Sequence, residues 1–497
     1  MVISAEMLVK RFYASGMLLL CGALLVFQLF VPPTLGVADN NDFPKLMGQF
    51  CLGQEHHPLF DYVSFRFHTD PKYCWDSHLL SSAALPVEAA VWLSRAILPA
   101  GDFDLRILGA IYAALFLLFF RFLQVSTREL SPATRVLLPA LVLLFFDTAT
   151  YVPTFSTFYS DTASFISLLF CGVFICRLVL RNAVSTGEYL VAAVCVILLV
   201  TSKAQHAVLG LLMAPAFLPA FGRARFPAVG VRIVAISAIA IASVAMFVSV
   251  PRWYCRTNYF NALFYQSLPR SRTPAADLAD LGIKPGMIRY VGQHAFLPDS
   301  PMQDSRQADD FGQTVSAMKL VRYYGSHLAV MMQVLDHALD EGGLQRVRME
   351  IGNREYRLGN YEISAGPGPA SQSQFMDFWS IFKALLFGNR GWLYGLYAPG
   401  LSMAAWAIAR KTRPDLRARA YLLAGIMTSM VVTAVAVVMF DGVDTGRHLF
   451  LLNALLDLSF CTLAGFAVGR LTRMEIFQEK PERTEISHIF LAARQQE

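Results

Sequence analysis

Two carboxylates stand close together in a short polar stretch, residues 38–45 (ADNNDFPK). Asp39 and Asp42 are three positions apart, directly after the first long apolar segment of the chain. A carboxylate at the mouth of a membrane cavity is poorly solvated, which raises its pKa and makes it a better proton acceptor once it is ionised. Either residue could therefore act as a general base. Asp and Asn also favour turns and helix N-caps, so a purely structural role stays open.

A second polar group, residues 202–206 (SKAQH), interrupts apolar sequence. The apolar segment before it, residues 189–201, would extend only about 20 Å as a helix, which is less than the roughly 30 Å hydrocarbon core. We therefore expect this turn to be recessed, with Lys203, Gln205 and His206 projecting into a wet pocket. A charge that faces lipid costs roughly 2.5–3.5 kcal/mol, so we expect Lys203 to have an anionic partner. The alternative is a lysine whose amine reaches the lipid headgroups.

Further polar residues flank other apolar segments at what should be the same level of the membrane. They are Asp147, Tyr159, Asp161, Asp441, Asp444, Arg447 and His448. Each alone fits a cap or an interface residue, but acids and bases that converge at one depth from several junctions indicate a site. The sequence contains no zinc-protease, paired CxxC, phosphate-loop or dinucleotide-binding motif. It leaves open a divalent metal ion on Asp39 and Asp42.

The elements that must position these residues are membrane helices. Of the 497 residues, 55% are hydrophobic and only 16% are charged, compared with roughly 25% charged residues in soluble proteins. Mean hydropathy is +0.46. The net charge of +6 does not indicate nucleic-acid binding, because the basic residues stand in short runs between apolar segments. The composition therefore predicts an all-α polytopic membrane protein.

Ten segments approach the length of about 20 apolar residues that a membrane helix needs. They are residues 12–32, 106–125, 135–152, 161–180, 189–201, 206–221, 228–250, 391–410, 419–440 and 448–471. Basic residues gather at alternate junctions, for example at residues 10–11 and 410–419, which predicts that both termini are cytoplasmic. The first segment could instead be a signal peptide, since Gly36 and Ala38 resemble a cleavage site, but its apolar run is longer than a signal core.

This topology divides the chain into four parts. Residues 1–250 form a seven-helix membrane module with a first outer loop at 33–105, residues 251–390 form a mixed extracytoplasmic loop domain, residues 391–471 form three C-terminal membrane helices, and residues 472–497 form a cytoplasmic tail. Amphipathic stretches at 86–98 and 316–339 should lie on the membrane surface or pack against the membrane module. Cys51 and Cys74 share the first outer loop, where a disulfide and two free thiols are both open.

Five stretches of the sequence resemble motifs of bacterial glycan-biosynthesis hexose transferases, which are GT-C membrane glycosyltransferases. They are residues 38–43 (ADNNDF), 202–206 (SKAQH), 278–283 (LADLGI), 358–361 (LGNY) and 447–453 (RHLFLLN). The order of seven membrane helices, a large outer loop and a few more helices is also similar. The family pattern is nearer to Asp-Asn-Gly-Asp-Phe and Lys-His-Leu-Phe, so Asn41 and Arg447 are departures. Arg447 keeps the positive charge, whereas Asn41 costs turn flexibility.

The resemblance implies a GT-C-like fold and a specific reaction. A hexose would pass, with inversion, from a polyprenyl-phosphate donor to a glycan or lipid-linked acceptor on the outer face of a bacterial cytoplasmic membrane. Such a displacement needs a base for the incoming hydroxyl and charge stabilisation for the departing phosphate. The analogy favours Asp39 over Asp42 as the base. It implies that Lys203, His206, Arg447 and His448 hold the donor phosphate and that Tyr159, Asp161 and Gln205 bind the sugar.

Two other classes of membrane protein fit part of the pattern. A secondary transporter would also have about ten helices, but its site usually lies near the midplane on broken helices in two matching repeats. No such repeat is evident in the sequence. A ligase or flippase for whole lipid-linked glycans would call for more arginines in the short outer turns, where only Lys203 and Arg447 stand. The sequence does not define the hexose, the acceptor, the length of the lipid, the metal dependence or the oligomeric state.

Overall fold

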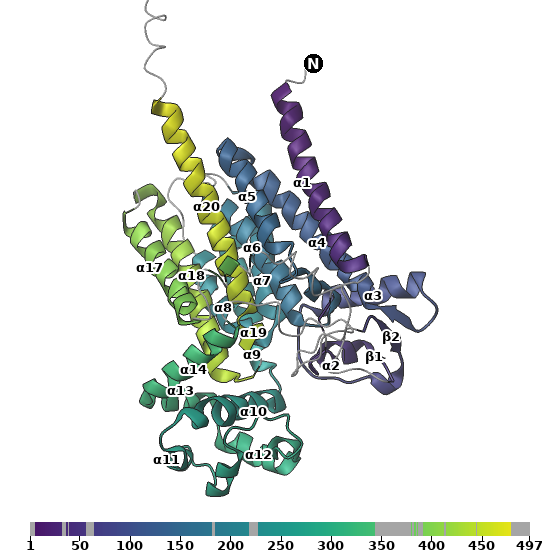
Figure 1. The fold of residues 1–497 in the computed structure, drawn as a ribbon, viewed down its shortest axis with the longest axis vertical. Helices are drawn as coiled ribbons and strands as arrows, with labels where there is room; N and C mark the ends of the chain where they lie inside the picture. The colour runs from purple at the N-terminus through teal and green to yellow at the C-terminus, as the bar shows by residue number, and fades with distance from the viewer. Residues whose placement is uncertain are drawn as a thin grey trace, which may run out of the picture.

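The computed structural model describes most of the chain. The described residues are 5–31, 36–37, 39–55, 64–180, 184–217, 227–342, 379, 382–383, 385, 391–411, 414–443 and 445–478. Within them the protein is mainly helical, with one small sheet. Figure 1 shows a bundle of long helices with two lobes at one end, while α1 begins and α20 ends at the opposite end. We call the lobe of residues 39–104 the first lobe and the lobe of residues 252–342 the second lobe.

The helices of the bundle match the predicted apolar segments. They are α1 (Ala5–Phe30), α4 (Leu105–Ser126), α5 (Pro132–Phe146), α6 (Ser160–Leu180), α7 (Thr186–Ser202), α8 (Ala207–Met213), α9 (Val229–Val248), α17 (Gly391–Lys411), α18 (Pro414–Phe440) and α20 (Phe450–Gln478). Among the described residues, five helical stretches are long and apolar enough to cross a membrane: Tyr13–Phe30, Leu105–Ser126, Ser160–Leu178, Val229–Val248 and Phe450–Gly469. The prediction of a multi-pass integral membrane protein is therefore confirmed.

The other predicted spans are helical but have shorter continuous apolar runs. Helix α5 has 15 residues and α7 has 17. Helix α18 begins in the basic run that precedes its apolar stretch. The topology of ten spans stays a prediction. Helix α20 also continues beyond the predicted span end at Leu471, to Gln478.

The order of the helices brings several distant segments to the end of the bundle that carries the lobes. Helices α6 and α7 are consecutive and pack side by side, so the beginning of α6 lies next to the end of α7. Helix α20 packs against α5 and α6, and the short helix α19 (Thr445–His448) precedes it. As a result, Arg447, just before α20, comes close to the beginning of α6 and the end of α7.

The first lobe contains a three-stranded antiparallel sheet, two helices and one disulfide. Its elements are α2 (Pro44–Met47), β1 (Leu52–Gly53), β2 (Arg66–Thr69), α3 (Ala84–Ile97) and β3 (Asp102–Asp104), with the strand order β1-β2-β3. Phe67 and Phe103 pair across β2 and β3 and are both buried. Their rings lie 5.3 and 5.7 Å from the ring of Phe158, just before α6. This aromatic contact fixes the lobe to the membrane module.

The second lobe is helical within its described residues. It comprises α10 (Arg252–Phe260), α11 (Pro274–Asp280), α12 (Ser305–Thr314), α13 (Ala317–Ser326) and α14 (Leu328–Gly342). The amphipathic stretch predicted over 316–339 forms two helices, because the chain leaves helical geometry at His327, and α14 packs against α17 and α18 of the bundle as expected. A short part of the predicted outer loop also lies inside the bundle, since Trp379 stacks on Phe145 of α5 at 3.6 Å.

Candidate functional site

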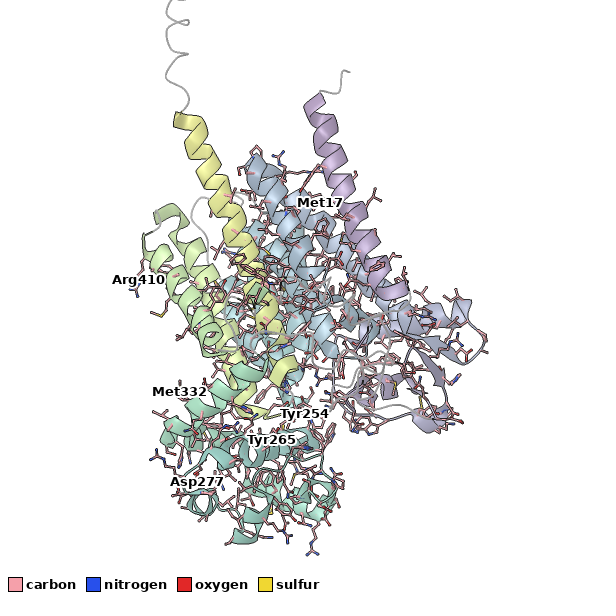
Figure 2. All side chains as sticks on the ribbon, viewed as in Figure 1. Met17, Tyr254, Tyr265, Asp277, Met332 and Arg410 are labelled. Carbon is pink, nitrogen blue, oxygen red and sulfur yellow. A yellow bond between two sulfur atoms is a disulfide. The ribbon has the colours of Figure 1, made fainter. Side chains whose placement is uncertain are left out.

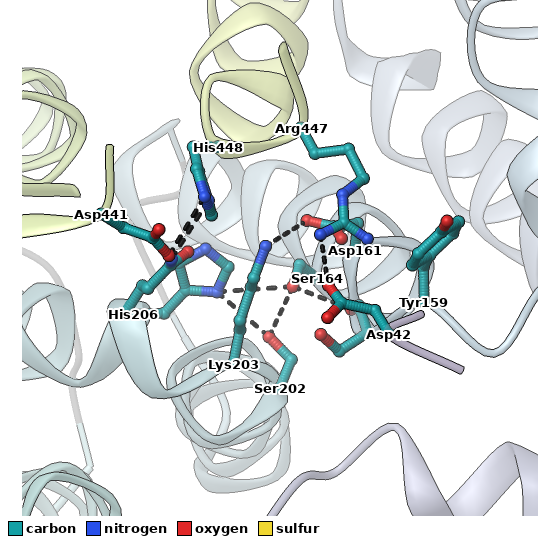
Figure 3. A network of polar contacts seen from close by, with 12 residues as sticks. Asp42, Tyr159, Asp161, Ser164, Ser202, Lys203, His206, Asp441, Arg447 and His448 are labelled. Carbon is teal, nitrogen blue, oxygen red and sulfur yellow. Dashed lines mark hydrogen bonds and ion pairs between the residues drawn. The ribbon is translucent and has the colours of Figure 1, made fainter. Parts of the chain in front are cut away.

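A cleft opens where the first lobe, α6, α7 and α19 meet. It encloses about 580 Å³, including its open mouth. Its charged lining consists of Asp42, Lys45, Asp161, Lys203 and Arg447, and Tyr159 and Tyr254 add aromatic surface. Figure 3 shows that Asp42, Asp161, Lys203 and Arg447 come from separate segments and point toward one another. The ends of α6 and α7 that line the cleft, and α19, lie at the end of the bundle that carries both lobes (Figure 1).

Asp42 reaches the cleft because the loop before α2 is held in a tight turn. Oδ1 of Asp39 accepts hydrogen bonds from the backbone N–H groups of Asp42, at 2.9 Å, and of Phe43, at 3.0 Å. Between the two acids, Asn41 adopts a φ of 77°, in the left-handed region that favours glycine. Asp39 itself is buried. Its carboxylate therefore shapes the turn, which is the structural alternative that the sequence left open.

Two cations bind the carboxylate of Asp42. Lys45, the second residue of α2, forms an ion pair with Oδ1 of Asp42. Arg447 of α19 forms an ion pair with Oδ2 of the same carboxylate. Burial disfavours the charged form, but Lys45 and Arg447 outweigh it and hold the pKa of Asp42 well below its usual range. In the free protein, Asp42 is therefore an ionised carboxylate.

Lys203 has the anionic partner that the sequence predicts. Its Nζ lies 2.9 Å from Oδ1 of Asp161, which is the second residue of α6. The two side chains are 11% and 10% exposed, so the pair is largely but not fully removed from solvent. Lys203 directly follows α7, which explains why the α6–α7 hairpin brings the two charges together.

Tyr159 connects the turn of the first lobe to α19. Its hydroxyl donates to Oδ1 of Asn40 at 3.1 Å and accepts from the backbone N–H of Asn40 at 3.0 Å. The guanidinium of Arg447 lies 4.3 Å from the centre of the Tyr159 ring, which is a cation–π distance. Arg447 is thus positioned by both the Asp42 carboxylate and the Tyr159 ring.

A second polar cluster lies beside the cleft without lining it. Nε2 of His448 lies 3.1 Å from Oδ2 of Asp441, and Nε2 of Gln205 donates to the same oxygen at 3.1 Å. Burial alone would raise the pKa of Asp441. The interaction with the neighbouring His448 has the larger effect, so the pKa of Asp441 is lower than its usual value. His206 is buried, with its Nδ1 3.2 Å from the hydroxyl of Ser202. Figure 3 shows this cluster next to the Lys203–Asp161 pair.

The structure therefore separates the predicted site residues into two sets. Asp42, Tyr159, Asp161, Lys203 and Arg447 line the cleft, whereas Asp39, Gln205, His206 and His448 do not. Asp147 was expected at the same level but binds Gln28 of α1 at 2.9 Å, away from this network. Asp444 lies outside the described residues.

Sequence reasoning missed several residues of the cleft, among them Lys45 and Tyr254. Lys45 could have been recognised, because a lysine three residues after Asp42 at the start of a helix can turn back toward it. Tyr254 had no such signal, since only the tertiary structure brings α10 to the cleft.

Cys51 and Cys74 form a disulfide in the structure. Among the residues that the structure describes, no group of three His, Cys, Asp or Glu side chains could hold a metal ion.

The fold and this site define a multi-pass integral membrane protein with a charged cleft at one end of its helix bundle. The chain belongs to the family described as the YfdI N-terminal transmembrane domain, whose profile matches residues 6–486. A comparison with curated proteins finds none that matches.

Among solved structures, the chain is similar to an oligosaccharyltransferase from Archaeoglobus fulgidus. Against the enzyme AglB in complex with an inhibitory peptide and a dolichol-phosphate, the TM-score is 0.39 at 13% identity, covering 97% of this chain and 54% of that one. Against the apo form, the TM-score is 0.42 at 12% identity, covering 98% and 55%. This chain thus spans about half the length of those structures, and the similarity is too low to support a functional conclusion.

Proposed function

We propose that the protein is a GT-C-type glycosyltransferase that moves a hexose from a polyprenyl-phosphate donor to a glycan or lipid-linked acceptor. The observation that supports this proposal is the cleft in which the Asp42 carboxylate faces Arg447 and Lys203. A transfer of this kind needs one proton acceptor and several cations within a few ångströms of each other. The predicted topology of ten spans places the cleft on the extracytoplasmic side of a bacterial cytoplasmic membrane.

Asp42 is our choice for the general base. Its carboxylate lines the cleft, whereas Asp39 is buried and accepts two backbone hydrogen bonds. In the reaction, the acceptor hydroxyl would lose its proton to Asp42 as its oxygen forms a bond to the anomeric carbon. The bond between that carbon and the phosphate oxygen would break on the opposite face, which inverts the configuration. The lipid phosphate would leave with the electron pair.

Arg447 and Lys203 are the proposed phosphate ligands. Arginine and lysine form charge-assisted hydrogen bonds to phosphate oxygens, and these stabilise the charge that develops on the leaving group. Both cations already hold carboxylates in the free protein, Asp42 and Asp161 respectively. A bound phosphate would compete with Asp42 for Arg447. Because Arg447 lowers the pKa of Asp42, this exchange would make Asp42 a stronger base when the donor is in place.

The remaining predicted residues take supporting roles in this proposal. Tyr159 and Asp161 line the cleft and can hydrogen-bond to sugar hydroxyls, while each also positions a cation. Gln205, His206 and His448 form the network behind Lys203, where they can hold the turn after α7. Of these three, His448 also pairs with Asp441, beside the Lys203–Asp161 pair.

Transfer by the purified protein tests this function directly. Wild-type protein in lipid nanodiscs is mixed with a radiolabelled polyprenyl-phosphate hexose and with glycan extracted from the membranes of the native organism. Label in the glycan supports the transferase. If no donor among several hexoses is used, the proposal fails. Labelled sugar or lipid that crosses sealed proteoliposomes without chemical change would instead support the transporter or flippase alternative.

A further inference from the structure

Aromatic side chains continue outward from the mouth of the cleft. Tyr254 lines the cleft, and Nζ of Lys45 lies 5.2 Å from the centre of its ring. Figure 2 places Tyr254 between the first lobe and the second lobe. The ring of Trp253 is 5.7 Å from that of Tyr254, and the ring of Trp75 is 5.9 Å from that of Trp253. A row of three aromatic rings therefore leads from the Asp42 side of the cleft toward solvent.

The two tryptophans come from different lobes, and Trp75 is held firmly. The disulfide between Cys51 and Cys74 ends one residue before it, and its backbone N–H donates to the carbonyl oxygen of Gly48 at 3.1 Å. A Cβ at position 48 would lie 2.9 Å from the carbonyl oxygen of Trp75, so this close approach requires glycine. Trp75 nevertheless remains 42% exposed. The disulfide and the contact with Gly48 thus hold the Trp75 indole in place while part of its surface stays exposed to solvent.

We propose that Trp75 and Trp253 form an acceptor subsite that stacks on a pyranose ring of a carbohydrate. This inference rests on the proposed function and names the acceptor side of the same site. One face of a pyranose ring presents C–H groups, which pack on the electron-rich face of an indole. A sugar ring on the two indoles would lie outside Tyr254, with the next residue of the glycan in the cleft. Its hydroxyl could then approach Asp42.

Membrane anchoring is the other common role of exposed tryptophans. The protein already has a surface that fits that role, because α3 exposes Leu85, Trp92, Leu93 and Ile97 along one helix. Trp75 has different neighbours, since the exposed, charged side chains of Lys72 and Asp76 flank it in the first lobe. Its ring also contacts the residue next to Tyr254 at the cleft. The position of the pair therefore favours a sugar over the lipid surface.

Acceptor titration of three variants tests the subsite. In the transfer assay, we expect Trp75→Ala and Trp253→Ala each to raise the KM for the acceptor about 10-fold, with Trp75→Phe intermediate. Binding of the labelled donor and its slow hydrolysis without acceptor should not change. Trp92→Ala is the matched control, because Trp92 is 65% exposed on α3, the helix whose exposed apolar side chains fit a membrane surface. Unchanged acceptor KM in both alanine variants overturns the subsite.

A binding measurement keeps the test independent of turnover. Oligosaccharides released by mild acid from the native envelope glycan are titrated against the purified protein, and quenching of tryptophan fluorescence is recorded. Saturable quenching that disappears in Trp75→Ala and Trp253→Ala supports the subsite even if no donor supports transfer, in which case only the proposed function fails. Absence of saturable binding by the wild type overturns the subsite. Unchanged acceptor binding in both variants, with weaker quenching of tryptophan fluorescence by brominated lipid than in the wild type, would identify a membrane anchor instead.

Discussion

The Lys203–Asp161 pair at the cleft and the Lys383–Asp457 pair inside the helix bundle have similar geometry but different surroundings. Their shortest nitrogen–oxygen distances are 2.9 and 3.0 Å. The side chains of Lys203 and Asp161 are 11% and 10% exposed, whereas those of Lys383 and Asp457 are 4% and 3% exposed. The first pair lines the cleft. The second joins Lys383 to Asp457 of α20, which also accepts a hydrogen bond from the hydroxyl of Tyr151 at 2.7 Å.

This difference distinguishes ion pairs that can bind a ligand from those that hold the fold. A fully buried ion pair has no contact with water. Removing one partner therefore leaves an unpaired charge in a medium of low polarity. A pair that borders a cleft can exchange its partner for a ligand of the same charge. We therefore expect the Lys383–Asp457 pair to stabilise the packing of the segment near Trp379. We expect the charged residues of the cleft to take part in the proposed transfer reaction.

The largest effect should come from Asp42→Asn. Loss of a general base typically lowers kcat by about 100- to 10,000-fold. Donor binding should persist, because Arg447 and Lys203 remain. The control is Asp76→Asn, an exposed acid of the same lobe that should leave kcat unchanged. Steady-state transfer and equilibrium donor binding are measured on the same preparations. Full activity of Asp42→Asn would remove this residue from the chemistry.

Arg447 offers the next largest effect and a matched pair of variants. Arg447→Gln should lower kcat/KM for the donor about 100-fold, because one cation at the phosphate is lost. Arg447→Lys keeps the charge near Asp42 and should stay within about 10-fold of the wild type. Arg252→Gln, an exposed position on α10, is the control. Equal losses in the lysine and glutamine variants would mean that Arg447 acts by shape alone.

Lys383→Met tests the other side of the comparison. It leaves Asp457 buried and charged, so we expect a loss of about 3–5 kcal/mol in stability. The double variant Lys383→Met/Asp457→Asn should recover much of this loss, since no charge is left unpaired and the amide can still accept from Tyr151. Unfolding midpoints in detergent measure both changes. Turnover per folded molecule should stay within about twofold of the wild type in the double variant. A double variant that folds but has no turnover would show that the Lys383–Asp457 pair is needed for the reaction and not only for the fold.

The pH dependence of stability separates Asp42 from exposed acids. Its pKa is lower in the folded protein than the usual value of about 3.9 in the unfolded chain. Its ion pairs therefore contribute stability above about pH 4, and this contribution is lost as the pH falls through the folded pKa. The difference in unfolding midpoint between wild type and Asp42→Asn should be largest at neutral pH and shrink below pH 4. A constant difference down to pH 3 would contradict the assigned charge.

The sequence located the helices and most of the charged residues of the cleft, because both depend on local pattern. Apolar runs and flanking charges define where a membrane helix can lie. The short segment before Lys203 correctly indicated a charge that needs a partner. The identity of that partner could not be predicted, because it depends on the α6–α7 packing that places Asp161 beside Lys203.

The roles of the two acids in the first lobe also needed the structure. Asp39 and Asp42 are both aspartates, so residue type does not distinguish them. The conformation of the turn between them decides which carboxylate reaches the cleft. The same limit applies to Lys383. The sequence placed it in an outer loop, whereas its contact with Asp457 and the stacking of Trp379 on Phe145 show that this part of the chain enters the bundle. Contacts between residues far apart in the chain carry information that residue types alone do not.

Asn41 provides the smallest test, because it acts on the position of Asp42 and not on its charge. Its φ of 77° is available to glycine without cost and to asparagine at low cost, whereas a β-branched residue is strained there. Asn41→Gly should therefore leave activity within about twofold of the wild type, and Asn41→Val should lose about 1–2 kcal/mol of stability. If the turn aims Asp42, Asn41→Val should also lower kcat with little change in donor binding. Equal activity of the glycine and valine variants, compared by transfer rate per folded molecule, would show that the Lys45 and Arg447 ion pairs position Asp42 without help from the turn.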